Sequence, residues 1–236
     1  MAELDAQIAV VTGAGRGIGQ AVSKRLATMG ALVLLVARDA ARLGKVQTEI
    51  TAAGGRAETQ SLDLLEQSAI TTFVEMIKTR HGRCDILVNN AGIGKIGRPL
   101  YETAPDDWDA MLGTNLRAPY LMIRGLAPLM IAAGRGHIIN VSSLAGHNPL
   151  KNGAAYAASK WGLNGLTYSV AEELRDHGIR VSAVAPGSVN TDFGSSGNDG
   201  TWKIQPEDVA NIVAMLVTQS PQSFVSEVLV RPARKP

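Results

Sequence analysis

Residues 7–19 read QIAVVTGAGRGIG, an apolar run that leads directly into a turn rich in glycine. The run predicts a short buried strand, and a helix is expected to follow the turn. The turn contains Gly13, Gly15, Gly17 and Gly19. Glycine permits a tight turn and a close approach of the backbone to a pyrophosphate, which rests on the free N–H groups of the following helix. No Gly-Lys-Ser/Thr follows, so this turn is interpreted as a dinucleotide-binding turn and not as a P-loop.

Short runs rich in valine and isoleucine alternate with longer amphipathic segments along the whole chain. Strands that are apolar throughout indicate burial on both faces of a parallel sheet. The alternation predicts an α/β fold with a doubly wound, mostly parallel seven-stranded sheet, helices on both faces and a single domain over residues 1–236. The predicted strands are residues 7–12, 31–37, 56–62, 85–90, 136–142, 179–185 and 225–230, and the predicted helices are 17–29, 39–53, 66–80, 106–132, 154–177 and 206–218.

The composition narrows the class of protein. The chain has 236 residues, of which 45% are hydrophobic and 19% charged, as expected for a soluble globular domain. A net charge of +2 is too small to indicate nucleic-acid binding. The single cysteine, Cys84, excludes an internal disulfide and opens an apolar run, which predicts a buried, inert thiol. The N-terminal residues do not resemble a signal peptide, and no apolar run approaches the roughly 18 residues of a membrane span, so we expect a cytoplasmic protein.

The end of the second predicted strand bears on the choice of cofactor. In NAD sites of this architecture an acid at that position binds the ribose 2′-hydroxyl. Here Ala37 occupies the expected acid position and Arg38 follows, while Arg16 in the glycine-rich turn can reach the same region. These residues favour NADP. Asp39 keeps NAD as a possible cofactor, because a strand that ended one or two residues later would make Asp39 the acid that binds the ribose. The alternative is that Asp39 caps the next helix.

The sequence YAASK at residues 156–160 places Tyr156 and Lys160 on one face of a predicted helix. A phenol titrates near 10, which is high for acid–base work at neutral pH. A lysine charge at ~4 Å in an effective dielectric of ~20 contributes roughly 4 kcal/mol, or about three pKa units. We therefore expect the pKa of Tyr156 to lie close to 7. Taken alone, the pair also fits a packed ring beside a solvated lysine.

Histidine is not required for such chemistry. The four histidines, His81, His137, His147 and His177, are too dispersed to form an obvious metal site or catalytic triad. Only His147, four residues after Ser143, is placed where it could face a substrate. We expect no metal.

Six motifs occur in one order along the chain: TGAGRGIG at 12–19, NNAG at 89–92, Asn115, Ser143, YAASK at 156–160 and PG at 186–187. With them the sequence resembles the short-chain dehydrogenase/reductase superfamily over essentially its whole length, including the thirteen residues between Ser143 and Tyr156. Within that superfamily it looks most like the 3-oxoacyl-carrier-protein reductases and their carbonyl-reductase relatives. The resemblance implies a Rossmann fold.

The resemblance also implies a role for each matched residue. Tyr156 would protonate the carbonyl oxygen as hydride arrives from the nicotinamide, and Ser143 would hold that oxygen. Lys160 would bind the nicotinamide ribose and lower the pKa of the phenol, and Asn115 would position a water that links Lys160 to solvent. The implied cofactor-binding residues are Gly13, Gly15, Arg16, Gly17, Ile18, Gly19, Arg38, Asp63, Leu64, Asn90, Ala91, Gly92, Tyr156, Lys160, Pro186, Gly187, Val189 and Thr191.

We therefore expect an NADPH-dependent oxidoreductase that reduces a ketone or a 3-oxoacyl thioester to the alcohol. Three departures put a carrier-protein partner in doubt. The substrate-side loop at 192–204 is short, residues 228–232 (VLVRP) lack a glycine-rich ending, and His177 stands where a basic docking residue is usual, although Arg135 and Arg175 lie nearby. Alternatives are an NAD-dependent alcohol or sugar dehydrogenase and a non-catalytic dinucleotide-binding regulator. An epimerase or dehydratase of the extended relatives would need a larger C-terminal domain.

The two longest predicted helices, 106–132 and 154–177, are more apolar than one covered sheet face requires. Relatives pair these helices across a two-fold axis into a four-helix bundle. We therefore expect a homotetramer, with a dimer as the simpler alternative.

Overall fold

A computed structural model of the chain describes residues 3–193, 200–220 and 222–234. Its seven strands form one sheet in the order β3-β2-β1-β4-β5-β6-β7, and every neighbouring pair is parallel. The predicted seven-stranded doubly wound sheet is thereby confirmed. The strands are β1 Ile8–Thr12, β2 Leu32–Ala37, β3 Arg56–Ser61, β4 Ile86–Asn89, β5 Gly136–Val141, β6 Ile179–Pro186 and β7 Glu227–Val230.

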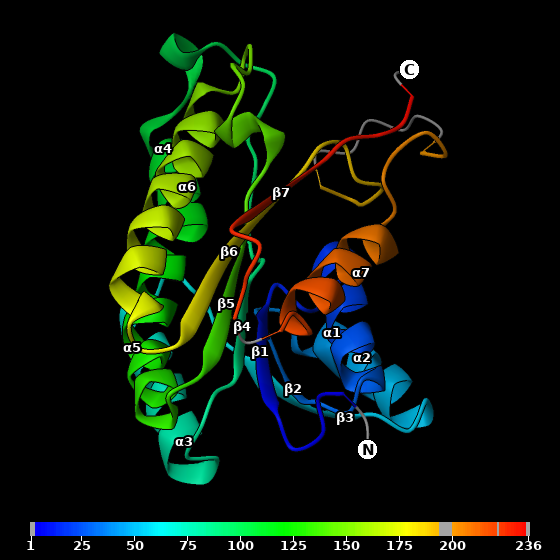
Figure 1. The fold of residues 1–236 in the computed structure, drawn as a ribbon. Coiled ribbons are helices and arrows are strands. Elements are labelled where there is room, and N and C mark those ends of the chain that lie inside the picture. The colour runs from blue at the N-terminus through cyan, green and yellow to red at the C-terminus, as the bar shows by residue number, and fades with distance from the viewer. Residues whose placement is uncertain (1–2, 194–199, 221, 235–236) are drawn as a thin grey trace.

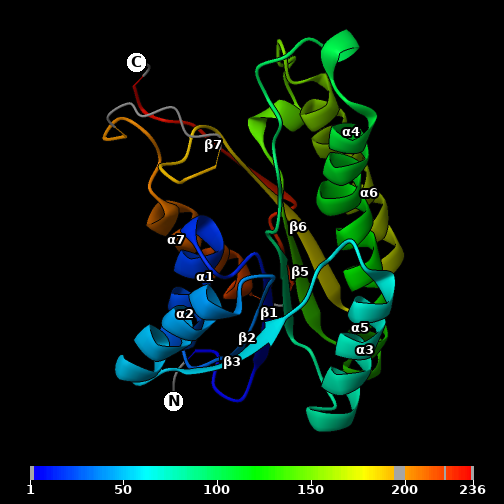
Figure 2. The same ribbon diagram turned by 180° about the vertical axis from the view of Figure 1, so that it is seen from behind.

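Helices cover both faces of the sheet (Figures 1 and 2). One face packs against α1 Gly17–Thr28, α2 Ala40–Ala52 and α7 Pro206–Val217, and the other lies beneath α3 Gln67–Arg80, α4 Pro105–Leu112, α5 Ala118–Ala133 and α6 Ala154–Arg175. The sheet therefore separates two hydrophobic cores, one beneath α1, α2 and α7 and the other beneath α3, α5 and α6. In β1, Ala9 and Val11 lie in the first of these cores, whereas Ile8 and Val10 lie in the second. Burial on both faces explains why this strand is apolar throughout.

The predicted continuous helix over 106–132 was wrong in one respect. The helix is interrupted by a wider π-helical turn, Gly113–Arg117, which separates α4 from α5. Pro119 has no N–H to donate to the carbonyl of Asn115, four residues earlier, so the ordinary α-helical bond is missing there. Turns of this kind occur frequently at functional sites.

The order of the strands fixes where a site can form. The chain leaves β1 toward β2 and β3 on one side, and continues from β4 to β7 on the other. In such sheets a ligand binds at the carboxyl ends of the strands where the order reverses, here between β1 and β4. No helix in the described part of the chain is long and apolar enough to cross a membrane.

Candidate active site

The turns that follow β1 and β4 are locked together at the reversal point. The hydroxyl of Thr12 accepts hydrogen bonds from the backbone N–H groups of Asn90 and Ala91, both at 3.0 Å. The side-chain amide of Asn90 donates to the carbonyl of Thr12 at 2.9 Å. The predicted NNAG segment therefore lies against the predicted glycine-rich turn, and the side chain of Asn90 bonds to the backbone of that turn.

Glycine is required where α1 packs onto this turn. A Cβ built on Gly19 would lie 2.2 Å from the carbonyl oxygen of Gly13, and Gly13 itself has a φ of +66°. The N-cap residue of α1, Arg16, makes no side-chain capping hydrogen bond, and the first turn of α1 contains no acidic residue. This helix therefore presents backbone N–H donors without an acidic competitor, which is the donor set that a pyrophosphate needs. The residues present fit a dinucleotide.

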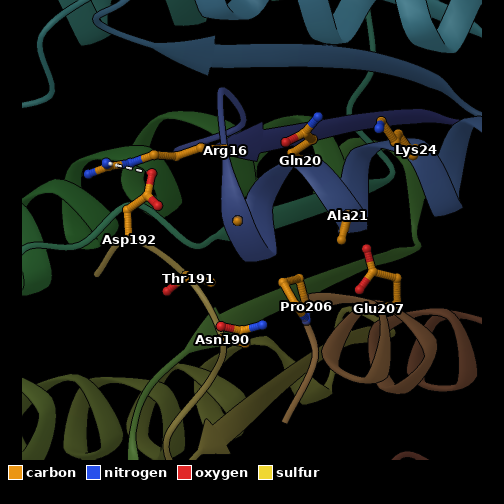
Figure 3. A pocket seen from close by; sticks show the side chains of 10 residues that line it. Arg16, Gln20, Ala21, Lys24, Asn190, Thr191, Asp192, Pro206 and Glu207 are labelled. Carbon is orange, nitrogen blue, oxygen red and sulfur yellow. Dashed lines mark hydrogen bonds and ion pairs between the residues drawn. The ribbon is translucent and has the colours of Figure 1, made fainter. Parts of the chain in front are cut away.

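The segment after β6 closes one side of the same turn. A cavity of about 330 Å³ lies between α1, residues 190–192 and the beginning of α7, and Figure 3 shows the side chains that line it. Arg16 and Asp192 form an exposed ion pair of 3.5 Å (Figure 3). A Cβ built on Gly17 would come within 3.0 Å of the Thr191 methyl group, so the two segments are in contact. The structure thus brings together four residues predicted from distant parts of the chain: Arg16, Gly17, Asn90 and Thr191.

The end of β2 settles the position of Asp39. The strand ends at Ala37, and the carboxylate of Asp39 accepts a hydrogen bond of 3.0 Å from the backbone N–H of Arg42. Asp39 is therefore the N-cap of α2, as one of the two interpretations of the sequence expected. Arg38 is exposed and lies 3.9 Å from Asp63, which was also predicted to contact the cofactor.

Arg42 is a cation that the sequence interpretation missed. Its Cβ would lie 3.3 Å from a Cβ built on Gly15, so its stem rests against the glycine-rich turn. Its guanidinium pairs with Asp39 at 3.2 Å. The N-cap at Asp39 was the available signal, because a residue three positions after a capping aspartate is held beside it.

Ser143, Tyr156 and Lys160 meet at the carboxyl ends of β5 and β6. Ser143 lies two residues after the end of β5 and caps a short 3₁₀ turn, Leu144–Gly146, by accepting from Ala145 N–H at 3.1 Å. Tyr156 and Lys160 project from the first two turns of α6, and both are buried. The hydroxyl of Ser143 lies close enough to the phenol of Tyr156 to influence its pKa. The predicted trio is therefore one cluster.

The expected pKa of Tyr156 was wrong. Burial raises the pKa of the phenol above its ordinary value of 10, and the nearby hydroxyl of Ser143 only partly opposes that effect. The amino group of Lys160 donates to the carbonyl of Val141 at 2.9 Å and lies 5.9 Å from the centroid of the Tyr156 ring. Burial lowers the pKa of Lys160 to about 8. The electrostatic argument from the sequence omitted the loss of solvation, which here is the larger effect.

Asn115 is fully buried, and its side chain makes its hydrogen bonds with other residues of the protein. Its oxygen accepts from Ile93 N–H at 2.8 Å, and its amide donates to the carbonyl of Ile93 and to Ser159. A Cβ on Gly92 would lie 3.3 Å from the Asn115 side-chain oxygen and 3.7 Å from the amino group of Lys160. The side chain therefore fixes the segment after β4 beside Lys160. The expectation that Asn115 positions a water stays a prediction. The side chain of Asn115 is already occupied, whereas Pro119 has no N–H to donate to the backbone carbonyl of Asn115, which leaves that carbonyl as the group for such a water.

The remaining predicted residues divide into two groups. Pro186 ends β6 and Gly187 follows it, and Gly187 N–H donates to the carbonyl of Val230 at 2.8 Å. The side chains of Leu64 and Val189, in contrast, pack into the core, so only their backbones are available to a ligand.

His147, the one histidine expected to face a substrate, is held by two side chains, and its role toward a substrate stays a prediction. Its ring nitrogen lies 2.6 Å from a carboxylate oxygen of Glu227 in β7 and 3.0 Å from the side-chain amide of Asn164.

Comparisons with known proteins agree with this geometry. A family model described as short chain dehydrogenase matches residues 7–201. An uncharacterized oxidoreductase of Staphylococcus saprophyticus is 34% identical over 98% of this chain and 100% of its own length. A metagenomic short-chain oxidoreductase, solved in complex with NADP, is 55% identical, with a TM-score of 0.89 over 99% of this chain and 100% of that one. An alcohol dehydrogenase from the archaeon Thermococcus sibiricus, complexed with 5-hydroxy-NADP, is 27% identical with a TM-score of 0.90 over 98% of both chains.

Proposed function

The chain belongs to the short-chain dehydrogenase family of oxidoreductases, and from that premise we propose that it is an NADPH-dependent reductase of carbonyl compounds. The observation that carries the proposal is the buried cluster of Ser143, Tyr156 and Lys160 beside an uncapped, glycine-rich helix start. NADPH, when bound, would supply a hydride to the carbonyl carbon.

The protein's own residues would supply the proton. Ser143 would donate a hydrogen bond to the substrate oxygen, and Tyr156 would transfer its phenolic proton to that oxygen as the alcohol forms. Because burial raises the pKa of Tyr156, the phenol is protonated at neutral pH, which is the form that reduction requires. Lys160, whose pKa is lowered to about 8, still carries a charge at pH 7 and would stabilise the phenolate left behind.

Several cations support NADP over NAD. Arg38 and Arg42 follow the end of β2, where an NAD site carries an acid, and Arg16 lies in the adjoining turn. Asp39, the residue that left NAD open, is used as a helix cap. The similar metagenomic oxidoreductase was solved with NADP. We propose that Arg38 and Arg42 together hold the 2′-phosphate, with Arg16 as an additional contact.

Small ketones and 3-oxoacyl compounds are the proposed substrates. Arg135 directly precedes β5. Arg175 ends α6 and His177 lies in the turn between α6 and β6, so all three lie at the amino edge of the sheet. Ser143 and Tyr156 lie at the opposite, carboxyl edge, about 20 Å away along a six-residue strand. A carrier protein docked at that edge could therefore deliver its substrate only to the active site of another subunit. A carrier-bound thioester is the second candidate, and it depends on the homotetramer that we propose. We also propose that the enzyme is cytoplasmic.

A parallel kinetic survey tests the proposal. Purified protein is offered small ketones and 3-oxoacyl thioesters, the latter on a small thiol and on the carrier protein, with NADPH and NADH in separate series. We expect turnover of the small substrates with NADPH and a higher kcat/KM than with NADH. A strong preference for the carrier-bound thioester would favour the second candidate. Binding of NADPH without turnover of any carbonyl would indicate a non-catalytic regulator instead.

A further inference from the structure

We propose that Phe193 forms an aromatic wall of the substrate site and selects ketones that carry an aryl group. This inference rests on the proposed carbonyl reduction and names the class of ketone that the site would prefer. It begins with a contact that the sequence did not predict, between the phenol of α6 and a ring from the segment after β6.

The ring of Phe193 lies against the ring of Tyr156. The two centroids are 5.8 Å apart and the planes are tilted by 51°, an arrangement within the favourable range for aromatic pairs. On its other side the ring meets the backbone of Gly94: a Cβ built there would lie 2.9 and 3.0 Å from two ring carbons of Phe193. Only glycine at position 94 leaves room for the ring in this position.

Three contacts of residues 190–193 position the segment that carries Phe193. Upstream, Asn190 N–H donates to the carbonyl of Ile204 at 2.8 Å, which anchors the root of the segment to a buried residue. Phe193 N–H donates to the hydroxyl of Thr191 at 3.2 Å. The neighbouring Asp192 pairs with Arg16 of the glycine-rich turn. The ring is therefore positioned by residues that also border the proposed cofactor site.

Further apolar side chains continue the wall. Ile96 lies beside Gly94, with its terminal methyl 3.5 Å from the built Cβ, and it approaches Gly153 to the same distance. Leu150 packs with Tyr156 in a small apolar cluster. Gly97 N–H donates to the carbonyl of Asn152 at 2.8 Å, so the segments after β4 and β5 are tied together along this wall.

The chemistry of the wall identifies the substituent that it would contact. Phe193 and Ile96 are 41% and 47% exposed although both are large and apolar, so they present hydrophobic surface next to the proposed proton donor. The charged neighbour Lys95 is paired with Asp107 at 3.9 Å. A flat apolar group on the ketone would bury this surface and stack on Phe193, whereas a small alkyl group would cover little of it.

The test compares acetophenone with butanone, each reduced with NADPH, in matched variants. Phe193→Ala removes the ring, and Phe193→Leu keeps apolar volume without an aromatic face. Tyr101→Ala is the control, because Tyr101 is 88% exposed and lies outside the wall. For Phe193→Ala we expect the ratio of kcat/KM for acetophenone to that for butanone to fall about tenfold, chiefly through KM, and the enantiomeric excess of 1-phenylethanol to decrease. Phe193→Leu should give an intermediate ratio, and Tyr101→Ala the wild-type ratio.

Two other outcomes are separable. An unchanged ratio and unchanged enantiomeric excess in an active Phe193→Ala enzyme would overturn the role of Phe193 and leave carbonyl reduction standing. A parallel rise in kcat/KM for both ketones would also overturn it. That result would mean that the ring of Phe193 blocks access to Tyr156 and must move aside before any ketone can bind. If the wild-type enzyme reduced 3-oxoacyl thioesters but neither ketone, the preference for aryl ketones would be overturned and carbonyl reduction would stand. Failure to oxidise NADPH with any of these carbonyl compounds would overturn the proposed function itself. Thermal unfolding of each variant verifies that it is folded.

Discussion

The amino group of Lys160 donates to the carbonyl of Val141 at 2.9 Å while it lies 5.9 Å from the centroid of the Tyr156 ring. The lysine is therefore anchored to the end of β5 and acts on the phenol across a distance. Burial affects the two groups in opposite directions, since it raises the pKa of Tyr156 and lowers the pKa of Lys160 to about 8. Both shifts favour the uncharged forms, a protonated phenol and a neutral amine.

These shifts predict different pH profiles for the two directions of the reaction. Reduction needs the protonated phenol, so its kcat should be nearly constant from pH 6 to 7.5 and fall above pH 8 as Lys160 loses its charge. Oxidation of the corresponding alcohol with NADP⁺ needs the phenolate, so its rate should still be rising at pH 9. Initial rates in both directions, at saturating cofactor, measure this. An oxidative rate that peaks near pH 7 would show that the pKa of Tyr156 is lowered in the working enzyme.

The cofactor assignment predicts a selective effect of Arg38. Charge-assisted hydrogen bonds contribute roughly 1.5–3 kcal/mol each, so Arg38→Ala should weaken NADPH binding by about ten- to a hundredfold. NADH, which has no 2′-phosphate, should bind almost as before. Titration of cofactor fluorescence gives both dissociation constants. Arg175→Ala is a matched control, because Arg175 is an exposed arginine paired with Glu172 at the far end of α6. Equal kcat/KM for NADPH and NADH in the unmutated enzyme would contradict the assignment.

The outer face of α4, α5 and α6 predicts the assembly. Tyr120 and Trp161 are 46% and 54% exposed there. Tyr120 borders a hollow of about 450 Å³ whose lining includes the three leucines Leu112, Leu116 and Leu166. We expect a homotetramer of the 24.8 kDa chain, with these helices paired between subunits. Tyr120→Glu would place a charge in that interface and should reduce the mass measured by light scattering, whereas Tyr101→Glu should not. A monomeric mass for the wild-type protein at micromolar concentration would contradict this prediction.

His137 predicts how the fold responds to acid. It is buried in β5 with its ring 2.8 Å from the hydroxyl of Ser182, and burial lowers its pKa to about 3. As the pH falls below 6.5, His137 becomes protonated in the unfolded chain but stays neutral in the folded chain. The free energy of unfolding therefore decreases. The slope contributed by this residue is at most about 1.4 kcal/mol per pH unit.

Urea unfolding of His137→Gln between pH 7 and 4.5 measures that slope. Glutamine keeps a donor for Ser182 and cannot titrate, so the variant should lose stability less steeply than the wild type. His177→Gln, at an exposed position, should follow the wild-type slope. If His137→Gln and the wild type gave parallel curves, acid sensitivity would have to come from other groups.

The local patterns of the sequence were sufficient for the fold and for most of the candidate site. The run at 7–12 and the turn after it are specified by burial on two faces and by glycine geometry, both of which are visible in the residue types. The π-helical turn was missed because apolar periodicity continues through it, although Pro119 was a usable signal. Phe193 could not be predicted to contact Tyr156, because 36 residues and a strand separate them and only the packed structure brings them together. The sign of the Tyr156 pKa shift likewise depends on burial, which the sequence does not state.

The central claim is that Tyr156 is the proton donor in NADPH-dependent carbonyl reduction. Its most direct test is the single-turnover rate of NADPH oxidation by Tyr156→Phe with saturating ketone, measured beside the dissociation constant of NADPH. The variant keeps the buried ring and removes only the hydroxyl, so we expect NADPH binding to be nearly unchanged and turnover to be abolished. Lys160→Ala should impair both quantities. If Tyr156→Phe retained a tenth or more of the wild-type rate, Tyr156 would not be the acid.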